Sequence, residues 1–422
     1  MKKLVTLLLV LTGFVCSAKA DWYVAGTADI VNGEAWTPNT EANKMEDIGG
    51  GLYRLVVTGK SLSSSTVCEY KITDGTWDNA YGWSDNNAYF SVQIDGTYTI
   101  TYIFDSTNFN VYEASALLTD GPDIYLHFNN NWSDNNDYKF NKAEGIYTLD
   151  LDISNYTETF YYRFHVKDWG NDCGTENDNY EISTGIYPEY NIILDNGNYY
   201  GEHNFKLPLD TKPCAKLSLT LKFINKKLVV AMQCHEKIST NANGYCTFVN
   251  NYPLTIDGAT AYYATDNNNG SATAVAITNP AANTPMLIKG SASTTYYFPV
   301  AASGSEDPSA TNAFKAGTST TAVSGLASGS GPYNYILNGD KFYAANGKKV
   351  AEGKAYLQLS AKAPVGARVL VFEDEESTGI GATLNDNGEM TNDQPVYNLA
   401  GQRVGQPTKG LYIVNGKKVI IK

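Results

Sequence analysis

The chain has 422 residues, which is long enough for two to four domains. Its formal net charge of −13 argues against nucleic acids and anionic membrane surfaces as partners. Tyrosine and glycine are abundant, with 31 and 37 residues, and apolar residues alternate with polar ones instead of following a helical period. We therefore expect an all-β protein.

Residues 1–20 have the pattern of a secretory signal. Lys2 and Lys3 precede an apolar run from Leu4 to Val15, and Ala18-Lys19-Ala20 is a small-residue cleavage site. We expect cleavage after Ala20 and export. Without the three lysines of this segment, 28 basic and 44 acidic residues remain, a net charge of −16. No later apolar run is long enough to span a bilayer, so no transmembrane segment is expected.

Residues 21–116 alternate as short strands separated by turns, as an immunoglobulin-like β-sandwich requires. The strand that ends at Thr73 runs into Asp74-Gly75, a strong hairpin signal, and then into a polar loop with Trp77, Tyr81 and Trp83. Aromatic rings on such a loop suit a sugar, whose C–H face packs on the ring while Asn, Asp and Lys bond its hydroxyls. The alternative is that these rings close the end of the sandwich.

Residues 117–233 repeat this plan and predict a second sandwich. Asp123-Ile-Tyr-Leu mirrors Asp21-Trp-Tyr-Val, and Trp132 mirrors Trp36. Arg163 precedes Trp169 by six residues, the interval that separates Lys71 from Trp77. Two copies that share a tryptophan and a basic residue are expected to share a site. Two weak sites on one chain bind a polymer with useful avidity.

The first repeat resembles carbohydrate-binding modules of the glycogen/starch type, which occur beside isoamylases and pullulanases and in the Sus outer-membrane starch-binding proteins. The resemblance covers roughly residues 21–115 and is carried by Trp36, Tyr70-Lys71-Ile72, Asp74-Gly75-Thr76-Trp77, Asp78-Asn79-Ala80-Tyr81-Gly82 and Asn86-Asn87. It implies an α-glucan such as starch or glycogen as the ligand. The predicted carbohydrate-binding residues are Trp36, Lys71, Trp77, Tyr81, Trp83 and Asn87 in the first repeat and Trp132, Arg163 and Trp169 in the second.

The remainder of the chain predicts three further segments. Residues 234–376 are rich in Ala, Thr, Ser and Gly and resemble a β-rich unit of exported Bacteroidetes proteins, which we interpret as a spacer. Residues 377–394 read as a solvated acidic linker. Residues 395–422, three short strands joined by Gly turns, resemble the C-terminal sorting signal of the type IX secretion system. That resemblance implies the secretion machinery as a partner, and a secreted or outer-surface location.

The sequence contains no enzyme motif that we can identify, so we expect no catalytic residues, no cofactor and no metal site. His-Glu-x-x-His is absent, the four histidines are scattered, and His165 is expected to be a packed or hydrogen-bonded sheet residue. With 44 acidic residues, no rule selects a glycosidase pair. The loop Trp132–Asp137 could hold calcium, but turn chemistry or sugar hydrogen bonding explains it better. Cys234 and Cys246 could close one small disulfide loop.

The favoured hypothesis is therefore an exported, non-catalytic glycan-binding protein with two binding modules. The first alternative is a structural or adhesive surface protein whose sandwiches bind no sugar. The second is a glycoside hydrolase, which would require converging carboxylates in a cleft between the repeats.

Overall fold

The computed structural model describes residues 20–84, 86–129, 131–167, 171–173, 180–181, 190–193, 204–210, 214–318, 323, 331–364, 369–372, 396–398, 403–404, 410–414 and 417–421. The predicted signal segment up to residue 19, Trp169 and the acidic linker lie outside these residues. The described elements are strands apart from two short 3-10 helices, η1 (Glu41–Asn43) and η2 (Asn136–Tyr138), which confirms the all-β prediction. Among these residues, no helix has the length and apolar character needed to cross a membrane.

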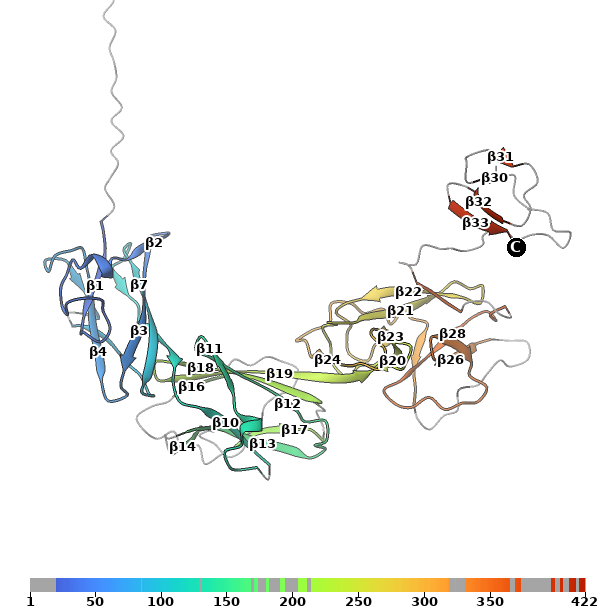
Figure 1. Cartoon of the computed structure of the whole chain (residues 1–422), viewed down its shortest axis with the longest axis horizontal. Helices are drawn as coiled ribbons and strands as arrows, with labels where there is room; N and C mark the ends of the chain where they lie inside the picture. The colour runs from blue at the N-terminus through green and yellow to red at the C-terminus, as the bar shows by residue number, and fades with distance from the viewer. Residues whose placement is uncertain are drawn as a thin grey trace, which may run out of the picture. The chain divides into compact units, whose positions relative to one another are not determined.

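The chain divides into two compact units, residues 1–236 and residues 237–422. The division lies close to the predicted end of the second repeat at residue 233. The first unit contains both repeats, and each is built as two facing sheets (Figure 1).

In the first repeat, one sheet has the order β1-β4-β5, with β6 also paired to β4, and the other contains β2, β3, β7 and β9 in that order, with β8 paired to β7. The core lies between them because alternate residues of β4 and β7 point inward and are buried. The strands are β1 (Tyr23–Gly26), β2 (Glu46–Gly49), β3 (Leu52–Leu62), β4 (Val67–Thr73), β5 (Ala80–Tyr81), β6 (Ala88–Ser91), β7 (Gly96–Asp105), β8 (Asn110–Val111) and β9 (Ser115–Asp120).

The second repeat has the same two layers. One sheet has the order β10-β13-β17-β15, with β14 paired to β13; the other contains β11, β12, β18, β19 and β16. Phe160, Tyr162, Phe164 and Phe205 fill the core between them. The strands are β10 (Ile124–Phe128), β11 (Asn141–Ala143), β12 (Ile146–Asp152), β13 (Thr159–Val166), β14 (Asn171–Cys173), β15 (Tyr180–Glu181), β16 (Tyr190–Ile193), β17 (Phe205–Pro208), β18 (Lys216–Ile224) and β19 (Lys227–Ser239).

The two repeats are joined by hydrogen bonds around Asn225, in the turn between β18 and β19. Its side-chain oxygen accepts from the backbone N–H of Ala116 at 2.7 Å, and its amide donates to the Ala114 carbonyl at 2.9 Å and to Glu113 at 3.1 Å. The backbone N–H of Asn225 also donates to the Ala116 carbonyl at 2.9 Å. These bonds extend one sheet from β9 into β18, so the repeats share a layer.

The second unit contains two packed sheets, β20-β23-β21-β22-β29 and β25-β28-β26-β27, whose apolar faces form one core. A small tail sheet has the order β31-β30-β32-β33. It contains four strands where three were predicted, because residues 396–404 form two strands, β30 and β31. The strands are β20 (Tyr245–Val249), β21 (Thr260–Asp266), β22 (Ala272–Ile277), β23 (Pro285–Lys289), β24 (Thr295–Pro299), β25 (Phe314–Ala316), β26 (Tyr333–Asn338), β27 (Lys341–Ala344), β28 (Ala355–Leu359), β29 (Leu370–Phe372), β30 (Val396–Tyr397), β31 (Arg403–Val404), β32 (Gly410–Val414) and β33 (Lys417–Ile421).

The five cysteines of the described residues are buried, and none of them forms a disulfide bond. The neighbour of Cys234 is Cys214, not Cys246: a hydrogen bond between the Cys214 and Cys234 thiols, together with burial, raises the pKa of Cys234. The fold therefore brings Cys234 next to Cys214, whereas the sequence suggested Cys246 as its partner.

Candidate functional site

The two repeats present a basic residue at the same position of the same strand pair. Strands β1 and β4 align Ala25 with Lys71, and strands β10 and β13 align His127 with Arg163. Residues paired across two strands point to the same side of the sheet, and consecutive residues of one strand point to opposite sides. Tyr70 and Tyr162, which directly precede the two basic residues, face the core and are buried. Lys71 and Arg163 therefore lie on equivalent outward faces, as the repeat pattern predicted.

Trp36 lies beside the outward face of the first repeat. Its backbone is left-handed, with φ of 52°, and its N–H donates to the carbonyl of Gly26, the last residue of β1, at 2.9 Å. Two residues later, the carbonyl of Pro38 accepts a hydrogen bond from the Thr73 hydroxyl at the end of β4. The segment that carries Trp36 thus runs along the strands that carry Lys71.

Trp77 lies in the turn after β4, and a network of hydrogen bonds to Asp74 orders that turn. The Asp74 carboxylate accepts from the Thr76 hydroxyl at 2.7 Å, the Thr76 N–H at 3.0 Å and the Asn79 amide at 2.7 Å. The bonds from Thr76 and Asn79 lower the pKa of Asp74. Gly75 adopts φ of 97°, where a side chain would be strained. The Trp77 ring is 47% exposed, so the turn presents it to solvent.

The flanking aromatics Tyr81 and Trp83 make packing contacts. Tyr81 stacks on Phe109 with ring centroids 4.8 Å apart and planes 11° apart, within a cluster that includes Trp22. The Trp83 Nε1–H donates to the Val111 carbonyl at 2.9 Å. Both side chains therefore connect loops of the sandwich, and each keeps part of its ring at the surface.

Asn87 lies near the outward face because it contacts Glu69. Glu69 precedes Lys71 by two residues on β4 and therefore faces the same side of the sheet. The Asn87 amide nitrogen is 3.4 Å from the Glu69 carboxylate. The first face thus brings together Lys71, Glu69 and Asn87, with Trp36 and Trp77 on the segments that border it.

In the second repeat, Trp132 and Arg163 are in direct contact. The guanidinium carbon of Arg163 lies 5.0 Å from the centroid of the Trp132 ring, within the range of a cation–π contact, and Trp132 is 42% exposed. Asn129 holds the loop that carries Trp132: its side chain accepts from the Tyr161 N–H at 2.6 Å and donates to the Thr159 carbonyl at 2.9 Å. Trp169 lies outside the described residues.

The second face also contains a cluster that the sequence analysis missed. The rings of His127 and His165 stack with centroids 4.7 Å apart and planes 6° apart. Their Nε2 atoms lie 3.2 and 3.5 Å from the same Asp134 carboxylate oxygen. Two of the four histidines are therefore not scattered in space, and Asp134 contacts side chains, not only its own turn.

The internal repeat contained a signal for this cluster. His127 corresponds to Ala25 and His165 to Thr73, which is diagonal to Ala25 across β1 and β4. Aligning the repeats strand by strand would have placed the two histidines on one face, next to each other.

No family model and no curated protein matches this chain. Among solved structures, a pullulanase from Bacillus acidopullulyticus is similar at 13% identity and a TM-score of 0.19. The match covers 36% of this chain and 28% of that one, so the chain spans less than a third of the length of that protein. A likeness this weak shows neither the fold nor the function of this chain.

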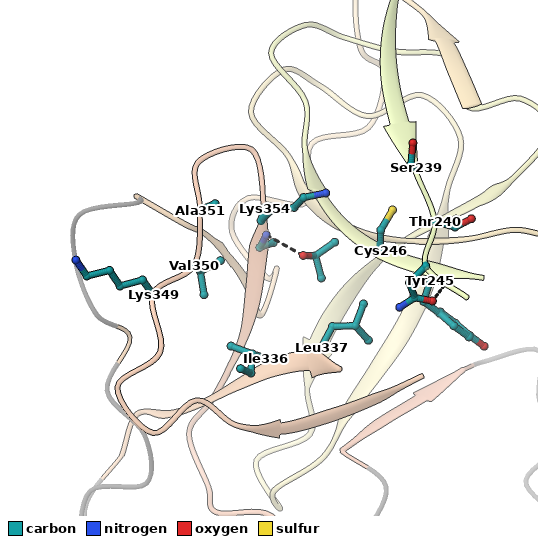
Figure 2. Close-up of a pocket in the computed structure, with 13 residues that line it drawn as sticks. Ser239, Thr240, Tyr245, Cys246, Ile336, Leu337, Lys349, Val350, Ala351 and Lys354 are labelled. Carbon is teal, nitrogen blue, oxygen red and sulfur yellow. Dashed lines mark hydrogen bonds between the residues drawn. The ribbon is translucent and has the colours of Figure 1, made fainter. Parts of the chain in front are cut away.

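A separate hollow of about 420 Å³ lies within the second unit (Figure 2). Among the described residues that line it are the sulfur-bearing Cys246, the hydroxyl of Thr247 and two lysines, Lys349 and Lys354, and none is His, Asp or Glu. The Thr247 hydroxyl accepts from the Ala355 N–H at 3.2 Å and links β20 to β28.

Proposed function

We propose that this chain is a non-catalytic glycan-binding protein that uses one outward face on each repeat. The contact between the guanidinium of Arg163 and the exposed ring of Trp132 is the observation that carries the proposal. It pairs a flat apolar surface with hydrogen-bond donors, which is the combination that a sugar ring requires. Lys71 occupies the position of Arg163 in the first repeat, on the strand that precedes the turn with the exposed Trp77.

The proposed ligand is a neutral α-glucan, starch or glycogen. The resemblance of the first repeat to glycogen/starch-type modules supports this class, and the acidic net charge of the chain does not oppose a neutral polymer. Binding would be shared: a polymer held by one face meets the second face at high effective concentration. The shared sheet from β9 to β18 would keep the two faces at a fixed separation.

The proposed location is the cell surface or the medium. The signal pattern of residues 1–20 and the resemblance of residues 395–422 to a type IX sorting signal support export across both membranes, with the secretion machinery as a transient partner. The described tail residues form the four-stranded sheet β31-β30-β32-β33, the kind of folded β tail that such a signal requires.

One observation favours the structural or adhesive alternative. Tyr81 and Trp83 have defined packing partners, so two of the six predicted binding residues of the first repeat would be present in a sandwich that binds no sugar. Trp77 and Trp132 are more exposed, at 47% and 42%, and Trp132 contacts Arg163 on the outward face, so closing the sandwich does not explain them.

The test is retention of the mature chain, residues 21–422, on insoluble starch, with cellulose and xylan in parallel. Retention on starch that soluble maltooligosaccharide competes away supports the α-glucan proposal. Retention only on another polysaccharide keeps the binding faces and replaces the ligand. If a sample that circular dichroism shows to be folded is retained on none of the three, binding of these glycan classes is overturned and the structural alternative remains.

A further inference from the structure

We propose that the second repeat binds a divalent metal ion of the zinc class through His127, Asp134 and His165. The three residues come from three separate elements: β10, the loop after β10, and β13. Their donor atoms lie within 4.8 Å of one another. The proposal does not depend on sugar binding.

The distances in the cluster agree with those expected between ligands of one metal ion. Zinc bonds of about 2.0–2.1 Å in a tetrahedral site place neighbouring donor atoms roughly 3.3 Å apart. The Nε2 atoms of His127 and His165 are 3.2 and 3.5 Å from Oδ1 of Asp134. The 3.2 Å contact between His127 and Asp134 is also within the range of a hydrogen bond, whereas the 3.5 Å contact from His165 is beyond it. Both Nε2 atoms lie close to one carboxylate oxygen, and all three donor atoms lie within 4.8 Å of one another.

The donor types select the metal class. Two imidazole nitrogens and one carboxylate oxygen suit zinc and neighbouring transition metals, whereas calcium and magnesium prefer oxygen ligands only. Three protein ligands leave a fourth position for water or another oxygen donor. The site is partly sheltered, since the side chains of His127 and His165 are 7% and 22% exposed and that of Asp134 is 39% exposed.

The site belongs to the second repeat alone. The positions equivalent to His127 and His165 in the first repeat are Ala25 and Thr73, which offer no imidazole. A metal ion would bind the Asp134 loop to the sheet and so fix Trp132, two residues before Asp134 in the same loop. Arg163 aligns with His127 across the strands, and its positive charge opposes cation binding. Removing that charge should therefore strengthen metal binding.

The experiment is zinc titration by calorimetry on the mature chain without a polyhistidine tag, followed by cobalt(II) absorption spectroscopy. The variants are Asp134→Asn and His165→Gln, with Asp137→Asn as the matched control, because Asp137 is an exposed carboxylate three residues later, in η2. Arg163→Gln tests the charge argument. Circular dichroism and tryptophan fluorescence verify folding, and Asp134→Asn preserves side-chain shape where His165→Gln does not.

The wild type and Asp137→Asn should bind one zinc ion with equal affinity and give the strong visible absorption of tetrahedral cobalt. Asp134→Asn and His165→Gln should weaken binding about 100-fold or more, since loss of a group behind a ligand already costs about 10–100-fold. Arg163→Gln should bind zinc more tightly than wild type. Wild-type protein that binds no zinc, or folded Asp134→Asn that binds it as tightly as wild type, overturns the proposal.

Discussion

Lys71 and Arg163 occupy the same place in two successive copies of one fold, each aligned with a residue of the neighbouring edge strand, Ala25 in β1 or His127 in β10. The position opposite the basic residue is small in one copy and an imidazole in the other. The two faces therefore share a hydrogen-bond donor but differ in the surface around it. This difference gives each face its own set of tests.

Replacing the exposed tryptophans should separate binding from folding. Trp77→Ala and Trp132→Ala should each weaken starch affinity about tenfold, because each removes an aromatic surface worth about 1 kcal/mol or more in stacking. Both rings are about half exposed, so the thermal midpoint should change little. Affinity electrophoresis in amylopectin measures the first effect and circular dichroism the second. Tyr343→Ala, at an exposed aromatic in the second unit, is the control. If the Trp77→Ala substitution unfolds the whole repeat, the Trp77 ring is part of the hydrophobic core.

Asp74 should control the order of the Trp77 turn. Asp74→Ala removes the acceptor for Thr76 and Asn79, so amide exchange at Thr76 should accelerate and affinity at the first face should fall several-fold. Hydrogen exchange with mass spectrometry, compared with wild type, measures the first effect. Unchanged exchange in this peptide would mean that Gly75 and the strand ends suffice to hold the turn.

The same carboxylate should make the turn sensitive to acid. The pKa of Asp74 is lower in the folded chain, so its stabilising bonds are fully present above the unfolded pKa near 3.8. They are lost as the pH falls through the folded pKa. Amide exchange in the turn, corrected for intrinsic rates, should therefore be constant from pH 7 to 5 and rise below pH 3.8 in wild type but not in Asp74→Ala.

Asn225 should hold the two repeats together. Asn225→Ala removes three side-chain hydrogen bonds and places a Cβ-bearing residue without a polar side chain at φ of 55°. We expect a loss of about 2–3 kcal/mol in the free energy of unfolding. All six tryptophans lie within residues 1–236, so urea unfolding followed by tryptophan fluorescence reports the unit that contains this joint.

A second variant separates the two causes. Asn225→Gly loses the same bonds but adopts left-handed backbone without strain, so it should be about 1 kcal/mol more stable than Asn225→Ala. Equal stability of wild type and both variants would show that the joint between β9 and β18 does not depend on this residue.

Cys68 and Cys246 should resist alkylation in the native chain. Burial raises the pKa of each thiol to about 11, so at pH 8 roughly one in a thousand is ionised. Iodoacetamide labelling at pH 8, read by peptide mass spectrometry, should be slow in buffer and rapid in guanidinium. Fast native labelling of either cysteine would mean that its strand opens readily.

The same shift predicts a loss of stability in alkali. Because the folded pKa is raised, the contribution of each thiol is fully present below the unfolded value near 9 and is lost as the pH rises towards 11. The thermal midpoint of Cys68→Ala should therefore fall less steeply than that of wild type between pH 9 and 11.

The sequence by itself determined the features that depend on near neighbours. Alternating apolar residues identified β4 and β7 as strands with one buried face, and Asp74-Gly75 identified the turn that presents Trp77. The internal repeat predicted that Lys71 and Arg163 are equivalent, because strands with the same pattern bury the same side. These are consequences of the two-residue period of a strand and of turn chemistry.

Only the tertiary structure decided which distant residues meet. The His127, Asp134 and His165 cluster requires the register of β10 on β13 and the path of the loop between them. The packing of Tyr81 on Phe109, and the choice of Cys214 over Cys246 as the neighbour of Cys234, likewise depend on how loops close over the sheets. Strand register depends on the burial of whole sheet faces across many strands. A shift of one residue would move every side chain of a strand to the opposite face, so no local sequence pattern determines the register.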